Sequence, residues 1–375
     1  MSGKKKLTKS QKIKRAKRLR KARANKSTFG SDKASFKAKE ILNNFSRIGK
    51  SKRQDRQTGI EGINSESLMN KTQGIIHQFT RFVREKYGIK YLNMFRQEHA
   101  IAYLKYKEEQ GLQYGSLQNI ESALINLDKA MKNDDVFRVV PFVMPDKRIY
   151  PTQPLHERIK RVDRSYSKES AESILRGLEE SGRYKLADGV FLALNAGLRA
   201  EEVCLIESRH FIYDENKKRY NIHIPVNDKS YVTKGNRFRE LWIDSRHTER
   251  ISRMLEGLEP NEPLIGEKAT TFSGNVRRFI TNELKMAVPE HVETMHGFRH
   301  RFARDRFQEY LPQTQEHQEM FNRMLDNMFA GHRADAGVLK EETKIYNEVK
   351  KALDQTHSDL GHGEGRWDLA MTYLC

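Results

Sequence analysis

Apolar residues recur at intervals of three and four along most of this chain, a spacing typical of amphipathic helices. Within residues 56–140 they define several such stripes, and Ser116 is positioned to cap the helix that carries the last of them. The apolar positions on which this prediction depends are Ile75, Phe79, Phe82, Val83, Ile101, Leu104, Leu117, Ile120, Leu124, Leu127 and Met131. The pattern predicts a small helical bundle over residues 56–140.

A second folded region is expected over residues 164–375. Four prolines within residues 141–163 interrupt regular structure and indicate a linker before it: Pro141, Pro145, Pro151 and Pro154. Beyond the linker, helical spacing dominates, beginning with a helix capped by Ser167. Two short segments instead alternate apolar and polar residues, one around Ile222 and the other around Leu241, with a Lys-Gly-Asn turn between them. We therefore predict a mainly α fold with a small antiparallel β-sheet.

The charge balance indicates a polyanionic partner. The chain of 375 residues has a formal net charge of +19, and no acidic residue precedes Asp32. Residues 1–55 are expected to form a basic arm, disordered when free, that adds affinity for phosphates. No apolar run reaches the roughly 18 residues that a membrane span needs, so nucleic acid is the favoured partner.

Cysteine usage adds little chemistry. Cys204 and Cys375 are the two cysteines, too few for a disulfide framework and without the spacing of metal ligands. Cys204 lies among apolar neighbours and is expected to be a small buried hydrophobic residue. This usage fits a reducing cytoplasm, and no metal or other cofactor is expected.

Four short motifs carry the candidate chemistry. In chain order they are Ala196-Gly197-Leu198-Arg199-Ala200-Glu201-Glu202, Thr233-Lys234-Gly235-Asn236, His296-Gly297-Phe298-Arg299-His300, and Leu360-Gly361-His362 followed by Tyr373. Arginine suits phosphate oxygens because its guanidinium is planar, permanently charged and able to donate parallel hydrogen bonds. A lysine at a hairpin tip can reach a groove and donate a proton, and a tyrosine hydroxyl can act as a nucleophile.

Together, these motifs resemble those of the tyrosine recombinases, the phage-type integrases of mobile elements, and the resemblance extends from about Leu68 to the end. It implies a helical, SAM-like core-binding domain followed by a catalytic domain. It also implies site-specific cleavage and rejoining of DNA through a 3′-phosphotyrosyl intermediate, without ATP or metal. By motif position, Tyr373 would be the nucleophile, Lys234 the general acid, and Arg199, Arg299, His296 and His362 the groups around the phosphate. Glu202 and His300 would support them.

One departure leaves a second nucleophile open. The interval between Arg299 and His362 is long for this family, and residues 303–345 are expected to form a helical insertion. His332 and Tyr346 make an alternative pair at its end, but Tyr373 is preferred because Leu360-Gly361-His362 matches the motif better.

Several functions remain open beside a site-specific integrase. A type IB topoisomerase would use the same chemistry, a non-catalytic DNA-binding protein could share the fold, and the basic arm alone would also suit RNA. The resemblance further implies double-stranded DNA as partner, self-association to a tetramer on DNA, accessory DNA-bending or excision factors, and a bacterial, cytoplasmic location.

Overall fold

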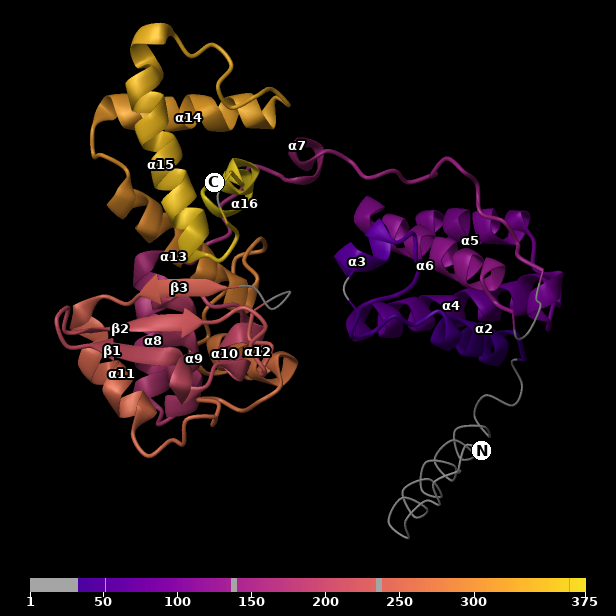
Figure 1. Ribbon diagram of the computed structural model, residues 1–375, viewed down its shortest axis with the longest axis horizontal. Helices are drawn as coiled ribbons and strands as arrows, with labels where there is room; N and C mark the ends of the chain where they lie inside the picture. Colours follow the sequence, from indigo (N-terminus) through magenta and orange to yellow (C-terminus); the bar gives the residue numbers. More distant parts are fainter. Residues whose placement is uncertain (1–32, 51, 136–139, 234–237, 364) are drawn as a thin grey trace, which may run out of the picture. The chain divides into compact units, whose positions relative to one another are not determined.

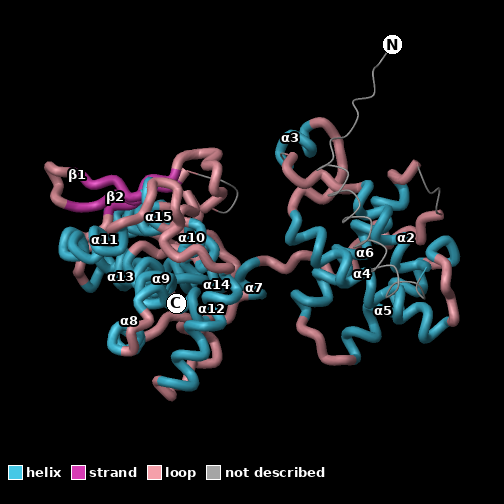
Figure 2. Tube along the Cα trace, turned by 90° about the horizontal axis from the view of Figure 1, so that it is seen from below, coloured by secondary structure: helices cyan, strands magenta, loops and turns pink. Residues whose placement is uncertain are grey.

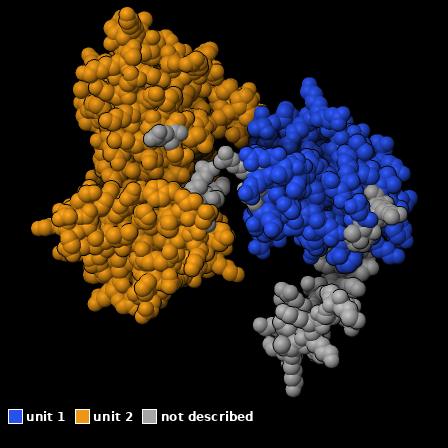
Figure 3. All heavy atoms as spheres, in the orientation of Figure 1, with its two compact units in different colours: residues 1–152 blue, residues 153–375 orange. Residues whose placement is uncertain are grey.

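The computed structural model describes residues 33–375, apart from residues 51, 136–139, 234–237 and 364. The chain separates into two compact units, residues 1–152 and residues 153–375, which are described one at a time (Figure 3). Among the described residues, helices predominate in both units, and the strands belong to the second (Figure 2). The described residues therefore confirm the predicted mainly α fold with one small sheet.

The first unit is a helical bundle around one apolar core. Its helices are α2 (Lys33–Asn44), α3 (Lys52–Gln57), α4 (Glu66–Tyr87), α5 (Gln97–Glu109) and α6 (Tyr114–Lys132), with a 3-10 turn at Leu92–Met94. Helices α2, α4 and α5 all pack against α6. Ser65 caps α4 through the N–H of Leu68, and Gly88 ends it at a φ of 69°. Helix α6 starts two residues before the predicted capping serine, Ser116.

The structure corrects the expected extent of the basic arm and of the linker. Helix α2 falls inside the expected arm, yet Ala38, Ile41 and Leu42 are fully buried in the bundle core. Residues 1–32 lie outside the described part of the chain. At the other end, residues 141–150 belong to the bundle, because Tyr150 is buried and the carboxylate of Glu121 accepts the N–H groups of residues 149 and 150.

The second unit is built around helix α13 (Thr294–Tyr310), which packs against α9 (Tyr184–Asn195) and α15 (Thr343–Asp359) (Figure 1). Helix α14 (Gln315–Phe329) packs on α15, so the expected insertion is helical and contributes to the core through Met320, Phe321 and Met324. The remaining helices are α7 (Leu155–Arg158), α8 (Lys168–Glu180), α10 (Ala200–Leu205), α11 (Thr248–Leu255), α12 (Ala269–Arg278, continuing as a π-helical turn, Phe279–Glu283) and α16 (Ala370–Tyr373).

A three-stranded antiparallel sheet flanks these helices, with strands in the order β1 (Phe211–Asp214), β2 (Arg219–Ile224) and β3 (Arg239–Trp242). Ile222 lies opposite Phe211 on one side and Leu241 on the other, so the inner face is apolar. Strands β2 and β3 match the predicted alternation, whereas β1 was not predicted. The predicted turn between β2 and β3, including Lys234, lies outside the described residues.

Candidate active site

The first motif forms a sharp turn between two helices. Helix α9 ends at Asn195, and Gly197 follows with a φ of 57°. A Cβ at Gly197 would lie 2.4 Å from the ring of Phe302, so both the backbone conformation and the close packing require glycine. The turn places Arg199 at the N-cap of α10, where its backbone N–H donates to Glu202 Oε2 at 2.9 Å.

Glu202 is a buried acid that joins three arginines. Its carboxylate accepts from Arg199 Nη1 at 2.6 Å and from Arg239 Nη1 at 2.7 Å, and Arg299 Nη1 lies 3.7 Å away. Burial acts to raise the pKa of Glu202, but the charges of Arg239, Arg299 and Arg199 outweigh it and hold the pKa below its usual value. The carboxylate is therefore ionised and fixes the directions of the surrounding guanidiniums.

Arg299 is fully buried and reaches the same point from helix α13. It donates to the carbonyl of Gly197, just after the end of α9, and to the carbonyl of Leu360, at the end of α15, at 2.6 Å. Its Nη2 also lies 3.1 Å from His362 Nε2, and Arg199 Nη2 lies 2.9 Å from the same nitrogen. Two guanidiniums thus converge on one imidazole nitrogen, His362 Nε2.

His362 reaches this point because helix α15 stops just before it. Gly361 has a φ of 70°, and the N–H of His362 closes the helix end on the carbonyl of His357 at 2.9 Å. Burial, followed by the charges of Arg299 and Arg199, holds the pKa of His362 well below its usual value. The imidazole is therefore neutral at physiological pH.

Tyr373 lies on α16 beside this group and is 7% exposed. Its ring centroid is 5.1 Å from that of His362 and 4.7 Å from that of His300, and the Arg299 guanidinium lies 5.6 Å from it. His300 in turn has a ring 6.1 Å from that of His296. Burial, then the charge of Arg299, lowers the pKa of His296.

Most of the predicted site residues are therefore together. Arg199, Glu202, His296, Arg299, His300, His362 and Tyr373 form one cluster, and Lys234 lies outside the described residues. The alternative pair is placed differently. His332 is exposed after α14, and Tyr346 is half-buried on α15, where burial and then the charge of Asp335 raise its pKa. Among the described tyrosines, Tyr373 is the one beside the convergent arginines.

Sequence reasoning missed Arg239, a fully buried residue of strand β3. Besides Glu202, it donates to the carbonyl of Ala196 at 2.6 Å and to that of Asp359 at 2.8 Å. A signal was available, because Arg239 lies two residues before Leu241 and so occupies an inward-facing position of the strand. Burial lowers its pKa to about 10, so it remains charged.

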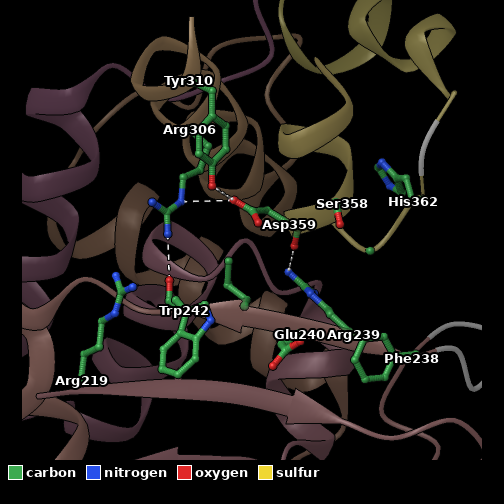
Figure 4. Close-up of a pocket in the computed structure, with 13 residues that line it drawn as sticks. Arg219, Phe238, Arg239, Glu240, Trp242, Arg306, Tyr310, Ser358, Asp359 and His362 are labelled. Atoms are coloured by element: carbon green, nitrogen blue, oxygen red, sulfur yellow. Dashed lines mark hydrogen bonds and ion pairs between the residues drawn. The ribbon is translucent and has the colours of Figure 1, made fainter. Parts of the chain in front are cut away.

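Next to Arg239 is an open cavity of about 730 Å³, lined by residues of β3, α13 and the end of α15 (Figure 4). Tyr310 donates to Asp359 Oδ2 at 2.8 Å, and Arg306 donates to the carbonyl of Trp242 at 2.9 Å. These bonds connect α13 to the end of α15 and to the sheet. His362 lines the cavity, so the cavity opens beside the arginines that surround Glu202.

The described residues hold neither a candidate metal site nor a candidate membrane span. No group of three or more His, Cys, Asp and Glu side chains there is arranged to hold a metal ion. None of the helices in that part of the chain has the length and apolar character needed to cross a membrane.

Comparisons with known proteins returned solved structures alone. No protein-family model matches the sequence, and no curated protein sequence matches it. XerH site-specific recombinase bound to its difH substrate is 13% identical, with a TM-score of 0.48, covering 83% of this chain and 90% of that one. Tn1549 transposon integrase in complex with circular intermediate DNA is 16% identical, with a TM-score of 0.45, covering 89% and 94%. A lambda integrase dimer bound to a COC′ core site is 15% identical, with a TM-score of 0.45, covering 82% and 77%.

Proposed function

We propose that this protein is a site-specific DNA recombinase of the integrase type. The observation that supports this most directly is the convergence of Arg199 and Arg299 on His362 Nε2, beside Tyr373. Two permanently charged guanidiniums close together can donate hydrogen bonds to the oxygens of a single phosphate. They can also stabilise the extra negative charge of a five-coordinate transition state. A tyrosine beside that position can attack the phosphorus.

In the proposed reaction, the Tyr373 hydroxyl attacks a DNA phosphodiester and transfers its proton to His362. The new bond joins phosphorus to the tyrosine oxygen, and the bond to the 5′-oxygen breaks. The products are a 3′-phosphotyrosine and a free 5′-hydroxyl, which takes its proton from Lys234. Because one ester replaces another, the reverse reaction with a second strand needs no ATP. The guanidiniums supply the charge stabilisation that a metal ion would otherwise provide.

The partner in this proposal is double-stranded DNA. The net charge of +19 supports it, and so does the lysine- and arginine-rich sequence of residues 1–32, since each phosphate neutralised releases counterions. Exchange between two duplexes cuts four strands, which four copies of the chain acting together would achieve. We also expect accessory DNA-bending or excision factors and a DNA-associated location in a bacterial cytoplasm.

Covalent capture tests the proposal. The protein is incubated with a library of nicked duplexes carrying a randomised segment, in the presence of EDTA, and adducts that survive SDS are isolated and sequenced. Wild type and Tyr346→Phe should form an adduct, and Tyr373→Phe should form none while still binding DNA. An adduct mapped to the peptide containing Tyr346 would contradict the assignment.

The captured DNA sequences also distinguish a recombinase from a topoisomerase and from a non-catalytic DNA-binding protein. A type IB topoisomerase would form the adduct and relax supercoiled plasmid without joining two captured sites. A non-catalytic DNA-binding protein would retain DNA without any adduct from the wild type. Joining of two plasmids that carry the captured sequence is the result expected of a recombinase.

A further inference from the structure

His357 is a buried histidine for which the proposed reaction has no role. It lies on helix α15, five residues before His362, and has no exposed surface. Both of its ring nitrogens are buried, and neither has a hydrogen-bond partner among the described residues. Buried polar groups are nearly always hydrogen-bonded, so an imidazole in this position needs an explanation. Burial lowers its pKa to about 4, so the ring is neutral and one nitrogen can accept a hydrogen bond.

The contacts of His362 determine which of its own nitrogens carries hydrogen. Its Nε2 lies within hydrogen-bond distance of guanidinium nitrogens of Arg199 and Arg299. A guanidinium has donors and no acceptor, so Nε2 must present a lone pair. The hydrogen of the neutral ring is therefore on Nδ1. This nitrogen is also buried without a partner among the described residues.

The unpartnered nitrogens belong to neighbouring rings. The centroids of His357 and His362 are 5.8 Å apart, with an angle of 39° between the planes. We propose that His357 is a positioning residue that accepts the Nδ1–H of His362, directly or through one water, and so keeps His362 Nε2 ready to take the proton of Tyr373. This inference rests on the proposed function.

The proton can then be followed through the step. When a phosphate enters, Arg199 and Arg299 donate to its oxygens and release the lone pair of His362 Nε2. The Tyr373 hydroxyl transfers its proton to Nε2 as its oxygen bonds to phosphorus and the 5′-oxygen leaves. The imidazolium so formed is surrounded by the positive charges of Arg199, Arg239 and Arg299. The phosphate offsets them on one side, and the hydrogen bond from Nδ1–H to His357 stabilises the cation on the other.

Two substitutions of similar size separate this role from simple packing. His357→Leu fills the space without an acceptor, and His357→Gln retains one. The full-length variants are compared in single-turnover adduct formation on a captured nicked duplex. His357→Leu should form adduct at least about tenfold more slowly, as part of the 10²–10⁴-fold that a positioned base contributes. Its DNA Kd should stay within about twofold and its Tm should not fall, and His357→Gln should recover most of the rate.

A second readout concerns the hydrogen bond itself. Protein labelled with ¹⁵N-histidine should show one slowly exchanging, low-field imidazole N–H, absent from both His362→Gln and His357→Leu. If His357→Leu forms adduct at the wild-type rate, the role of His357 is wrong and the proposed function stands. Absence of that N–H signal from the wild type would have the same meaning. If wild type forms no adduct, the proposed function fails, and the N–H signal still decides whether His357 holds His362.

Discussion

Replacing Arg239 with methionine should destabilise the second unit more than almost any other single arginine substitution. The guanidinium of Arg239 is fully buried and donates to Glu202 and to the carbonyls of Ala196 and Asp359. Breaking a buried ion pair costs about 3–5 kcal/mol. Methionine would fill most of the volume, and Glu202 would keep Arg199 at 2.6 Å. The expected loss in the free energy of unfolding is therefore at the lower end, about 3 kcal/mol.

Urea unfolding followed by tryptophan emission measures this loss in residues 153–375, the part of the chain that contains Arg239. Trp242 and Trp367 are the two tryptophans of the chain, and both belong to residues 153–375. With a urea dependence of about 2 kcal/mol per molar, a loss of 3 kcal/mol lowers the midpoint by roughly 1.5 M. Adduct formation should fall as well, because Arg239 fixes Glu202, which in turn directs Arg199.

Arg246→Met is the matched control. Arg246 is exposed, and its Nε lies 3.5 Å from Asp244 Oδ2. Surface pairs of this kind contribute about 0–1 kcal/mol, so its midpoint should move little. If Arg239→Met unfolds at the same urea concentration as Arg246→Met, the buried network does not stabilise the unit as argued.

Three further predictions concern pH, catalysis and the basic arm. Burial lowers the pKa of His300 to about 3 and of His357 to about 4 from the usual 6.5, so the unfolded chain takes up protons first as pH falls. The contribution of these histidines to the free energy of unfolding is therefore present above pH 6.5 and falls as the pH drops. Each histidine should cost about 1 kcal/mol by pH 5.5, and His357→Leu should reduce this pH dependence. Arg199→Ala should slow adduct formation at least about a hundredfold and should destabilise less than Arg239→Met, because the Arg199 side chain is partly exposed. Adduct formation near the wild-type rate would mean that Arg199 does not contact the phosphate. Arg299→Ala should slow adduct formation and also lower the free energy of unfolding, because Arg299 is fully buried. Deleting residues 1–30 should flatten the plot of log Kd against log salt by about one unit for each phosphate that the arm neutralises; an unchanged slope would contradict a role in DNA affinity.

The sequence predicted the parts of the site that depend on local backbone chemistry. Gly197 and Gly361 both have positive φ and end helices, so the turns that deliver Arg199 and His362 could be identified from short motifs. Tyr373 could be preferred over Tyr346 for the same reason. These features require no knowledge of which segments pack together.

The features that were missed depend on long-range packing. Arg239 is buried because its acceptors come from residues 196, 202 and 359, far away along the chain. In α2, high lysine content masked an apolar stripe that only the bundle makes evident. Strand β1 has four residues, of which Phe211 alone is buried, so its pairing with β2 rather than its own pattern defines it.

The charge balance of the cluster explains why so many polar groups tolerate burial there. Arg199, Arg239 and Arg299 carry three positive charges, and Glu202 supplies one negative charge. Carbonyls at the ends of α9 and α15 accept from Arg239 and Arg299, and these helix ends carry partial negative charge. Arg239 and Arg299 are thus compensated within the protein, whereas Arg199, whose side chain is 21% exposed, shares its carboxylate with both of them. The remaining positive charge lies next to Tyr373 and His362, and the negative charge of a phosphodiester would offset part of it.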